Sequence, residues 1–106
     1  MNSILVTGSS GFIGRKVLEK LPKLGVITDY DNSIRIDLQN INEVMKINSA
    51  DIVIHLAGKT PKKKLEWNDY FNGNISSTLN ILEYCVKKKV EKLIYVSNYI
   101  YGNPKY

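Results

Sequence analysis

The chain has 106 residues, of which 43% are hydrophobic and 24% are charged, and its formal net charge is +5. This length corresponds to one small domain, residues 1–106, with room for a cofactor-binding unit but not for a separate substrate lobe. No apolar run approaches membrane-spanning length, no signal peptide is visible, and the single cysteine, Cys85, cannot form an internal disulfide. These features argue against membrane insertion and predict a soluble, cytoplasmic protein.

Two lysine runs, residues 62–64 and 87–89, carry local positive charge. Neither run is interleaved with aromatic residues in a nucleic-acid-binding motif, and lysines at the end of a helix interact favourably with the helix dipole. We therefore expect both runs to be solvated, and we predict no nucleic-acid partner.

Apolar periodicity predicts alternating strands and helices along the chain. A nearly continuous apolar run at residues 52–56 is typical of a central parallel strand that is covered on both faces. The longest helix is indicated by apolar residues at helical spacing, namely Ile75, Leu79, Leu82 and Val86. The predicted strands are residues 4–6, 25–28, 33–36, 52–56 and 92–96, and the predicted helices are residues 12–21, 41–47 and 71–88.

This alternation indicates the α/β class, with right-handed crossovers and a doubly wound parallel sheet of the Rossmann type. We expect five strands in the order 3-2-1-4-5. Ligands of such sheets bind beyond the carboxyl ends of the strands, where the direction of the connections reverses. The turn after the first strand, the aspartates after the second and Ser97 after the fifth would all face this crevice.

The most informative segment is Thr7–Gly14, which follows the first strand and has the spacing G-x-x-G-x-x-G. Gly8 would make the turn, Gly11 would admit phosphates, and Gly14 would let the helix approach the strand. The phosphates would lie over the free N–H groups and the positive dipole end of the helix that starts near Phe12. The segment predicts a dinucleotide site; the alternative is an ordinary glycine turn between a strand and a helix.

An acidic residue after the second strand has a defined role in such sites, because its carboxylate accepts hydrogen bonds from the adenosine ribose and repels a 2′-phosphate. Asp31 fits this role by its distance from Gly14, and Asp29 is a close rival. Either could instead be a solvated turn residue, because the segment 29–33 is rich in turn formers. The carboxylate favours NAD over NADP as the cofactor.

Six segments, in order along the chain, resemble the N-terminal part of the extended short-chain dehydrogenase/reductase family, the NAD-dependent nucleotide-sugar epimerases and dehydratases. Residues 7–14 are similar to the family's T-G-x-x-G-[FY]-I-G turn, and residues 55–58 to its H-[LF]-A-[AG] segment. Residues 74–82 resemble N-V-x-G-T-x-N-[LI]-L, with Ser77 in place of the usual glycine, and residues 96–102 resemble S-S-x-x-V-Y-G. The remaining two are Asp31-Asn32, similar to the ribose-binding pair, and Asp37-Leu38, similar to the pair beside the adenine.

The resemblance implies reversible hydride transfer between NAD and a carbon of a nucleotide sugar. Ser97 matches the catalytic serine that hydrogen-bonds the reacting oxygen. The family's Tyr-x-x-x-Lys pair has no counterpart: Tyr101 and Lys105 have the spacing, but Gly102 and Pro104 argue against a helix there. The implied cofactor-binding residues are Gly8, Gly11, Phe12, Ile13, Gly14, Asp31, Asn32, Asp37, Leu38, Leu56, Ala57, Gly58 and Asn74.

We expect the fold to stop before the last strands and the substrate lobe, so that this short chain is the NAD-binding portion of an epimerase, dehydratase or reductase and is inactive by itself. The alternative is a non-catalytic nucleotide-binding or protein-interaction module; an NADP-binding redox sensor is a weaker option. An unpaired edge strand with Tyr95, Ile100 and Tyr101 exposed predicts self-association. His55 is expected to support the backbone, and no metal-ligand set is visible.

Overall fold

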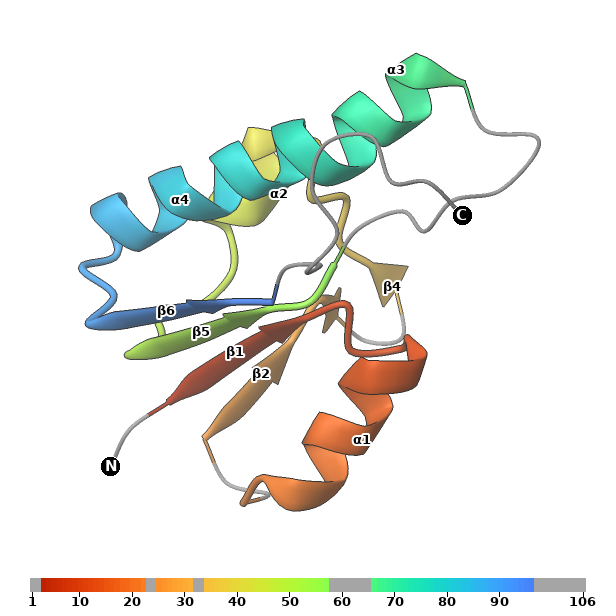
Figure 1. Cartoon of the computed structure of the whole chain (residues 1–106). Coiled ribbons are helices and arrows are strands. Elements are labelled where there is room, and N and C mark those ends of the chain that lie inside the picture. The colour runs from red at the N-terminus through yellow and green to blue at the C-terminus, as the bar shows by residue number, and fades with distance from the viewer. Residues whose placement is uncertain (1–2, 23–24, 32–33, 58–65, 97–106) are drawn as a thin grey trace.

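Four parallel strands form the central sheet of the computed structural model, which describes residues 3–22, 25–31, 34–57 and 66–96 (Figure 1). The strands lie in the spatial order β2-β1-β5-β6. Within the sheet, Leu5 of β1 is paired with Ile27 on one side and with Val53 on the other. Their bounds are β1 Ile4–Thr7, β2 Val26–Thr28, β5 Ile52–His55 and β6 Lys92–Tyr95.

Helices lie on both faces of this sheet. α1 (Phe12–Lys20) covers one face, while α2 (Ile41–Met45) and α4 (Ser77–Lys87) cover the other (Figure 1). α4 continues directly from α3 (Trp67–Tyr70) and a π-helical stretch, η1 (Phe71–Ser76). Within the described ranges, no helix combines the length and the apolar character that a membrane crossing requires. The arrangement confirms the predicted Rossmann-type α/β fold.

The predicted order 3-2-1-4-5 is right for four strands and wrong for the third, residues 33–36. In the described part of that segment, β4 (Ile34–Arg35) pairs antiparallel with β3 (Tyr30–Asp31) in a separate two-stranded sheet. The Ile36 N–H extends this pairing by donating to the Asp29 carbonyl oxygen at 2.8 Å. The reason is chain length: a parallel neighbour needs a crossover of about a dozen residues or more, whereas strands this close in sequence can pair antiparallel.

The main hydrophobic core lies between the sheet and helices α2 and α4. Tyr84 is fully buried in it, and its hydroxyl donates a 2.6 Å hydrogen bond to the Asn48 carbonyl oxygen. Burial raises the pKa of Tyr84 to about 12, so the phenol stays protonated. Cys85 packs beside the core and burial raises its pKa, which fits an unreactive structural thiol. The buried core residues are Leu5, Leu38, Val44, Ile47, Ala50, Val53, Ile81 and Tyr84.

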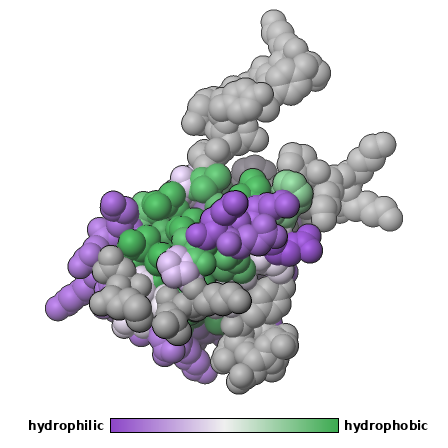
Figure 2. Space-filling model, turned by 90° about the horizontal axis from the view of Figure 1, so that it is seen from below, coloured by the Kyte–Doolittle hydropathy of each residue, from purple (hydrophilic) through white to green (hydrophobic). Residues whose placement is uncertain are grey.

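The opposite face of the sheet is less completely covered. Side chains alternate along a strand, so Val53 points into the core while Ile52 and Ile54 point to the side of α1, where they are half-buried. Ile94, which pairs with Ile54, is exposed. Seen from this side, apolar side chains gather on the surface (Figure 2). In the described chain, α1 therefore shields only part of this face.

The long helical segment begins at Trp67, earlier than the predicted residue 71. The Glu66 N–H donates to the Asp69 carboxylate at 2.9 Å, and the Asp69 N–H donates to the Glu66 carbonyl oxygen at 3.0 Å. These two bonds close the first turn and satisfy groups that a helix start leaves unpaired. The sequence signal was the acidic residue three positions after Glu66, which apolar periodicity alone overlooks.

The face of this segment that packs on the sheet is not the one whose apolar spacing predicted the helix. The residues that predicted the helix from their spacing, Ile75, Leu79, Leu82 and Val86, are all exposed. The buried residues of the same segment are Gly73, Ser77, Ile81 and Tyr84. Two small residues thus allow the helix to approach the sheet, and a second apolar face is directed to solvent.

A buried hydrogen-bond chain joins the carboxyl ends of β1 and β5 to α4. The Thr7 hydroxyl lies 2.6 Å from His55 Nδ1, and the Thr78 hydroxyl lies 2.9 Å from His55 Nε2. Thr7 Oγ1 also accepts the backbone N–H groups of Leu56 at 3.1 Å and Ala57 at 3.2 Å, so its own proton is directed to Nδ1. These partners assign the neutral tautomer with the proton on Nε2 to His55. The side chain lies where a supporting role was expected.

We expect the free energy of unfolding to fall as the pH drops from 6.5 towards 4. Burial lowers the pKa of His55, the only histidine, from 6.5 to about 4, and the Asp29 charge opposes this only in part. Between these values the unfolded chain binds a proton that the folded chain does not. Stability from this group is therefore full above pH 6.5 and is lost towards pH 4, by about 3 kcal/mol in total at about 1.4 kcal/mol per pH unit. Urea unfolding across this pH range measures it.

The control for this prediction is His55→Phe, which fills a similar space but has no titrating group. Its absolute stability is expected to be lower, because Thr7 and Thr78 lose their partner. The free energy of unfolding of this variant should nevertheless change less with pH than that of the wild type, by the amount assigned to His55. An equal slope in both proteins would show that other groups cause the pH dependence.

Candidate nucleotide-binding site

The turn between β1 and α1 lies directly against the end of β5. Gly8 has a φ of +70°, and a Cβ atom there would lie 2.7 Å from the Ala57 backbone nitrogen. A Cβ atom at Gly14 would overlap the Gly8 carbonyl oxygen. Both positions therefore require glycine, Gly8 for the bend and Gly14 for the approach of the helix to the turn.

Gly11 lies where the turn passes into α1. Its N–H donates to the Gly8 carbonyl oxygen at 3.1 Å, and its own carbonyl oxygen accepts the Arg15 N–H at 2.9 Å, which begins the helix. Gly11 is exposed and lines the cavity beside the turn. The following N–H groups belong to the first turn of α1, which has no intrahelical acceptor for them. This end of α1 is thus suited to bind an anion.

Asp29 fixes the turn to the end of β2. Its Oδ2 accepts the Gly8 N–H at 2.9 Å, and its Oδ1 accepts the Ser9 N–H at 3.2 Å and the Ser9 hydroxyl at 2.5 Å. The residue is only 4% exposed. Hydrogen bonds that a carboxylate accepts are stronger than those between neutral groups. Two of the turn's amides are therefore already used by Asp29, and the amides nearer α1 are the ones left for a ligand.

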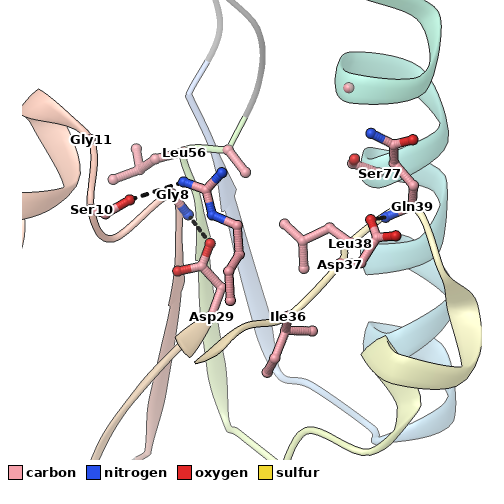
Figure 3. Close-up of a pocket in the computed structure, with 13 residues that line it drawn as sticks. Gly8, Ser10, Gly11, Asp29, Ile36, Asp37, Leu38, Gln39, Leu56 and Ser77 are labelled. Atoms are coloured by element: carbon pink, nitrogen blue, oxygen red, sulfur yellow. Dashed lines mark hydrogen bonds between the residues drawn. The ribbon is translucent and has the colours of Figure 1, made fainter. Parts of the chain in front are cut away.

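A cavity of about 350 Å³ opens at this edge of the sheet. One wall is formed by the glycine turn and Asp29, and the facing wall by residues 36–39 and Ser77 of α4 (Figure 3). Its lining residues are Gly8, Ser10, Gly11, Asp29, Arg35, Ile36, Asp37, Leu38, Gln39, Leu56, Ala57, Gly73 and Ser77. The cavity is thus lined by apolar side chains, backbone atoms and a few charged groups, a combination typical of small-molecule and cofactor sites.

Charged groups lie on both walls of the cavity. The Arg35 guanidinium donates from Nη2 to the Ser10 hydroxyl at 3.1 Å, which places a cation beside the glycine turn. Asp37 is exposed on the facing wall, where its Oδ1 accepts the Gln39 N–H at 3.0 Å. The cavity therefore offers a positive group next to the turn and a negative group across from it.

Small residues of the helical segment also line the cavity. Gly73 of η1 and Ser77 of α4 are buried and line it. The Ser77 hydroxyl donates to the Asn72 carbonyl oxygen at 3.1 Å, so the serine that replaces the expected glycine has a local partner. The Asn80 side-chain amide donates to the Leu38 carbonyl oxygen at 2.9 Å and ties α4 to the facing wall.

The structure brings together about half of the residues that the sequence predicted for the cofactor. Six of them line the cavity: Gly8, Gly11, Asp37, Leu38, Leu56 and Ala57. Phe12 and Ile13 lie exposed in the first turn of α1, and Gly14 is buried behind the turn. Asp31 belongs to β3. Asn74 belongs to η1 and does not line the cavity. Asn32, Gly58 and the predicted catalytic Ser97 lie outside the described residues.

Sequence reasoning missed Ser10, Arg35, Ile36, Gln39, Gly73 and Ser77 as cavity residues. Ser10 and Gln39 had an available signal, because each adjoins a residue that was predicted. Arg35 became part of the wall only because β4 folds back on β3, a pairing that the sequence analysis did not foresee. In the described chain, no group of three or more His, Cys, Asp or Glu side chains could hold a metal ion.

We expect Asp29→Asn to lower the free energy of unfolding by about 2 kcal/mol, because hydrogen bonds to a buried charged acceptor are lost and an amide NH₂ would face N–H donors. Urea unfolding at neutral pH measures the change. The matched control is Asp37→Asn, which changes an exposed carboxylate that accepts one described backbone N–H, from Gln39. Its expected effect is below about 1 kcal/mol. Equal effects at the two positions would contradict the role assigned to Asp29.

The comparisons with known proteins agree with this geometry. The model of the NAD dependent epimerase/dehydratase family matches residues 4–106. A UDP-glucose 4-epimerase of Pisum sativum is 28% identical over 134 residues, which cover 96% of this chain and 38% of that protein. A crystal structure of a UDP-galactose 4-epimerase has a TM-score of 0.74 at 28% identity, covering 92% of this chain and 38% of that chain.

A Helicobacter pylori ADP-L-glycero-D-manno-heptose-6-epimerase has a TM-score of 0.77 at 23% identity, covering 99% of this chain and 42% of that one, which supports the fold. The chain spans about two fifths of the length of the curated relatives it matches. The resemblance to extended short-chain dehydrogenases/reductases, which six segments suggested, is confirmed. The family model matches residues 4–106, nearly the whole chain and including the glycine turn. The chain therefore belongs to the NAD dependent epimerase/dehydratase family.

Proposed function

We propose that this chain is the NAD-binding portion of a nucleotide-sugar epimerase, dehydratase or reductase. The observation that carries the proposal is the glycine turn: Gly8 and Gly14 are required by its close backbone contacts, and a cavity opens beside it at the carboxyl ends of β1 and β5. Membership of the family supports the cofactor class. The epimerase names of two relatives support a nucleotide-sugar substrate.

The residues present fit such a cofactor. The pyrophosphate would lie over Gly11 and the first amides of α1, because the amides of Gly8 and Ser9 already bind Asp29. The adenosine would lie towards the facing wall, where Asp37 and Leu38 line the cavity. The remaining proposed cofactor-binding residues are Phe12, Ile13, Asp31, Asn32, Leu56, Ala57, Gly58 and Asn74.

When bound, NAD supplies the group that accepts and returns a hydride. Ser97 is proposed to hydrogen-bond the reacting oxygen of the substrate. A side chain that removes the hydroxyl proton has no proposed counterpart in these 106 residues, because Gly102 and Pro104 disfavour a helix carrying Tyr101 and Lys105. We therefore propose that the 106-residue chain binds the cofactor but does not turn over a sugar unaided.

The preference for NAD over NADP rests on the acidic end of strand β2. Asp29 and Asp37 place carboxylates on both walls of the cavity, and a 2′-phosphate would be repelled by them. One observation favours NADP as a second candidate: Arg35 lines the same cavity and its guanidinium binds Ser10 beside the turn. A guanidinium there could accommodate a 2′-phosphate.

The alternative function is a non-catalytic nucleotide-binding or protein-interaction module. The exposed apolar face of the long helical segment is the observation that favours an interaction role. Calorimetry separates cofactor binding from the interaction role: tight NAD binding supports the cofactor role, whereas no binding of NAD, NADP or UDP-glucose supports a protein-interaction module. The cytoplasmic location expected from the sequence is proposed together with the cofactor role.

We expect Gly11→Val to weaken NAD binding at least tenfold while leaving the fold intact. The backbone of Gly11 is extended (φ −76°, ψ 174°), a conformation that valine adopts readily. A Cβ atom there would lie 3.3 Å from the Gly8 carbonyl oxygen, and the added side chain would take up space beside the cavity that Gly11 lines. Isothermal titration with NAD measures the affinity, and thermal unfolding checks the fold.

The control is Ser49→Val, an exposed position just before β5, at the opposite end of the sheet strands from the cavity. It should bind NAD as the wild type does. Equal affinities for Gly11→Val and the wild type would contradict the placement of the phosphates over Gly11.

The cofactor preference is tested by titrating NAD and NADP into the wild type and into Arg35→Gln. We expect NAD to bind the wild type more tightly than NADP, because carboxylates outnumber the cation in the cavity. Arg35→Gln should weaken NADP binding more than NAD binding, since one charge-assisted phosphate contact contributes about 1.5–3 kcal/mol. Tighter binding of NADP by the wild type, lost in Arg35→Gln, would establish the second candidate instead.

A further inference from the structure

Ser77 is a buried polar residue on the cavity wall that faces the glycine turn. It is 4% exposed, it begins α4, and it lines the cavity together with Gly73 (Figure 3). Serine here is also a departure of this chain from the glycine of the pattern that residues 74–82 resemble. A hydroxyl in such a place is shielded from bulk water, so the direction of its proton determines what it offers to a ligand.

The hydroxyl proton of Ser77 is already used within the helical segment. It is donated to the Asn72 carbonyl oxygen at 3.1 Å. Asn72 belongs to the π-helical stretch η1, and the i→i+5 geometry of a π-helix brings its carbonyl oxygen next to Ser77. A serine hydroxyl has one donor and two acceptor lone pairs. Ser77 therefore offers a ligand in the cavity a hydrogen-bond acceptor.

The rest of this wall combines a second acceptor with apolar surface. The Asp37 carboxylate lines the cavity and has lone pairs besides the one that accepts the Gln39 N–H. Leu38 adds an apolar side chain, and its carbonyl oxygen is already bound by the Asn80 amide. Gly73 has no side chain and leaves room beside Ser77. Such a wall suits a flat ring whose edge donates hydrogen bonds.

We propose that Ser77 determines the base specificity of this site, because its hydroxyl oxygen accepts a hydrogen bond from the exocyclic amino group of the adenine. The assignment rests on the proposed function, in which the adenosine lies towards this wall. Hypoxanthine carries a carbonyl oxygen in place of the amino group, so two acceptors would face each other. Turning the Ser77 proton towards that oxygen would cost its hydrogen bond to Asn72. A glycine at this position could not discriminate in this way.

The role of Ser77 is independent of the self-association that the sequence predicts at the edge of the sheet. β6 is an edge strand, and Tyr95 on it is exposed. Ile100 and Tyr101, also predicted to take part, lie outside the described residues, so self-association stays a prediction. Ser77 is buried in α4 and does not belong to that edge.

Isothermal titration of the 106-residue chain with NAD and with nicotinamide hypoxanthine dinucleotide tests the assignment. The wild type should prefer NAD by about tenfold or more, because a site that binds an N–H group rejects an analogue without it. Ser77→Ala should weaken NAD binding by about fivefold, the loss of one neutral hydrogen bond, without weakening the binding of the analogue. Ser77→Gly, a second variant without the hydroxyl, should lose the same part of the preference.

The matched control is Ser76→Ala, at the neighbouring serine. The Ser76 hydroxyl also donates to Asn72, to Oδ1 at 3.5 Å, but Ser76 does not line the cavity. This variant should keep the wild-type preference, and thermal unfolding should show that all variants are folded. An unchanged preference in Ser77→Ala and Ser77→Gly, with NAD still bound, would overturn the role of Ser77 and leave the proposed function standing. A wild type that binds neither dinucleotide would overturn both.

Discussion

The close contact between the backbone of Gly8 and the end of β5 is the constraint on which the rest of the structure depends. No side chain fits between Gly8 and Ala57, so the turn lies directly on the neighbouring strand. Thr7 and Asp29 hold it there from two sides: Thr7 binds the amides that follow β5, and Asp29 binds the amides of the turn. Because these polar groups satisfy one another, the ends of β1, β2 and β5 can be buried together. α1 then begins directly after Gly11, which lines the cavity.

The helical segment from α3 to α4 connects this site with the surface of the molecule. Its small residues, Gly73 and Ser77, let it approach the sheet and line the cavity, while Asn80 binds the loop of the facing wall. Its large apolar residues are on the other side, exposed to solvent. A side chain of ordinary size at the small positions would push the helix away from the sheet and fill the cavity at the same time. The same small residues therefore determine both how closely this helix packs on the sheet and the shape of the cavity.

The predictions from the sequence were wrong or incomplete where an interaction between distant segments decided the outcome. Residues 33–36 have the composition of a strand, and the length of the connection, rather than composition, made them pair antiparallel with β3. Apolar spacing identified the long helix correctly but did not show which face is buried, because the buried face contains glycine and serine. Asp29 and Asp31 were both plausible at the end of β2, and hydrogen bonds to a turn some twenty residues away distinguish the position of Asp29.

By itself the sequence determined the α/β class, the parallel strands β1, β2, β5 and β6 with their order, and the turn at residues 7–14. These features follow from local patterns, because apolar runs and glycine spacing restrict the backbone wherever they occur. The tertiary structure alone decided the walls of the cavity, the buried partners of His55 and which face of the long helix is exposed. Each of these depends on which side chains meet across the fold, and residues that lie far apart in the chain carry no local signal of their contact.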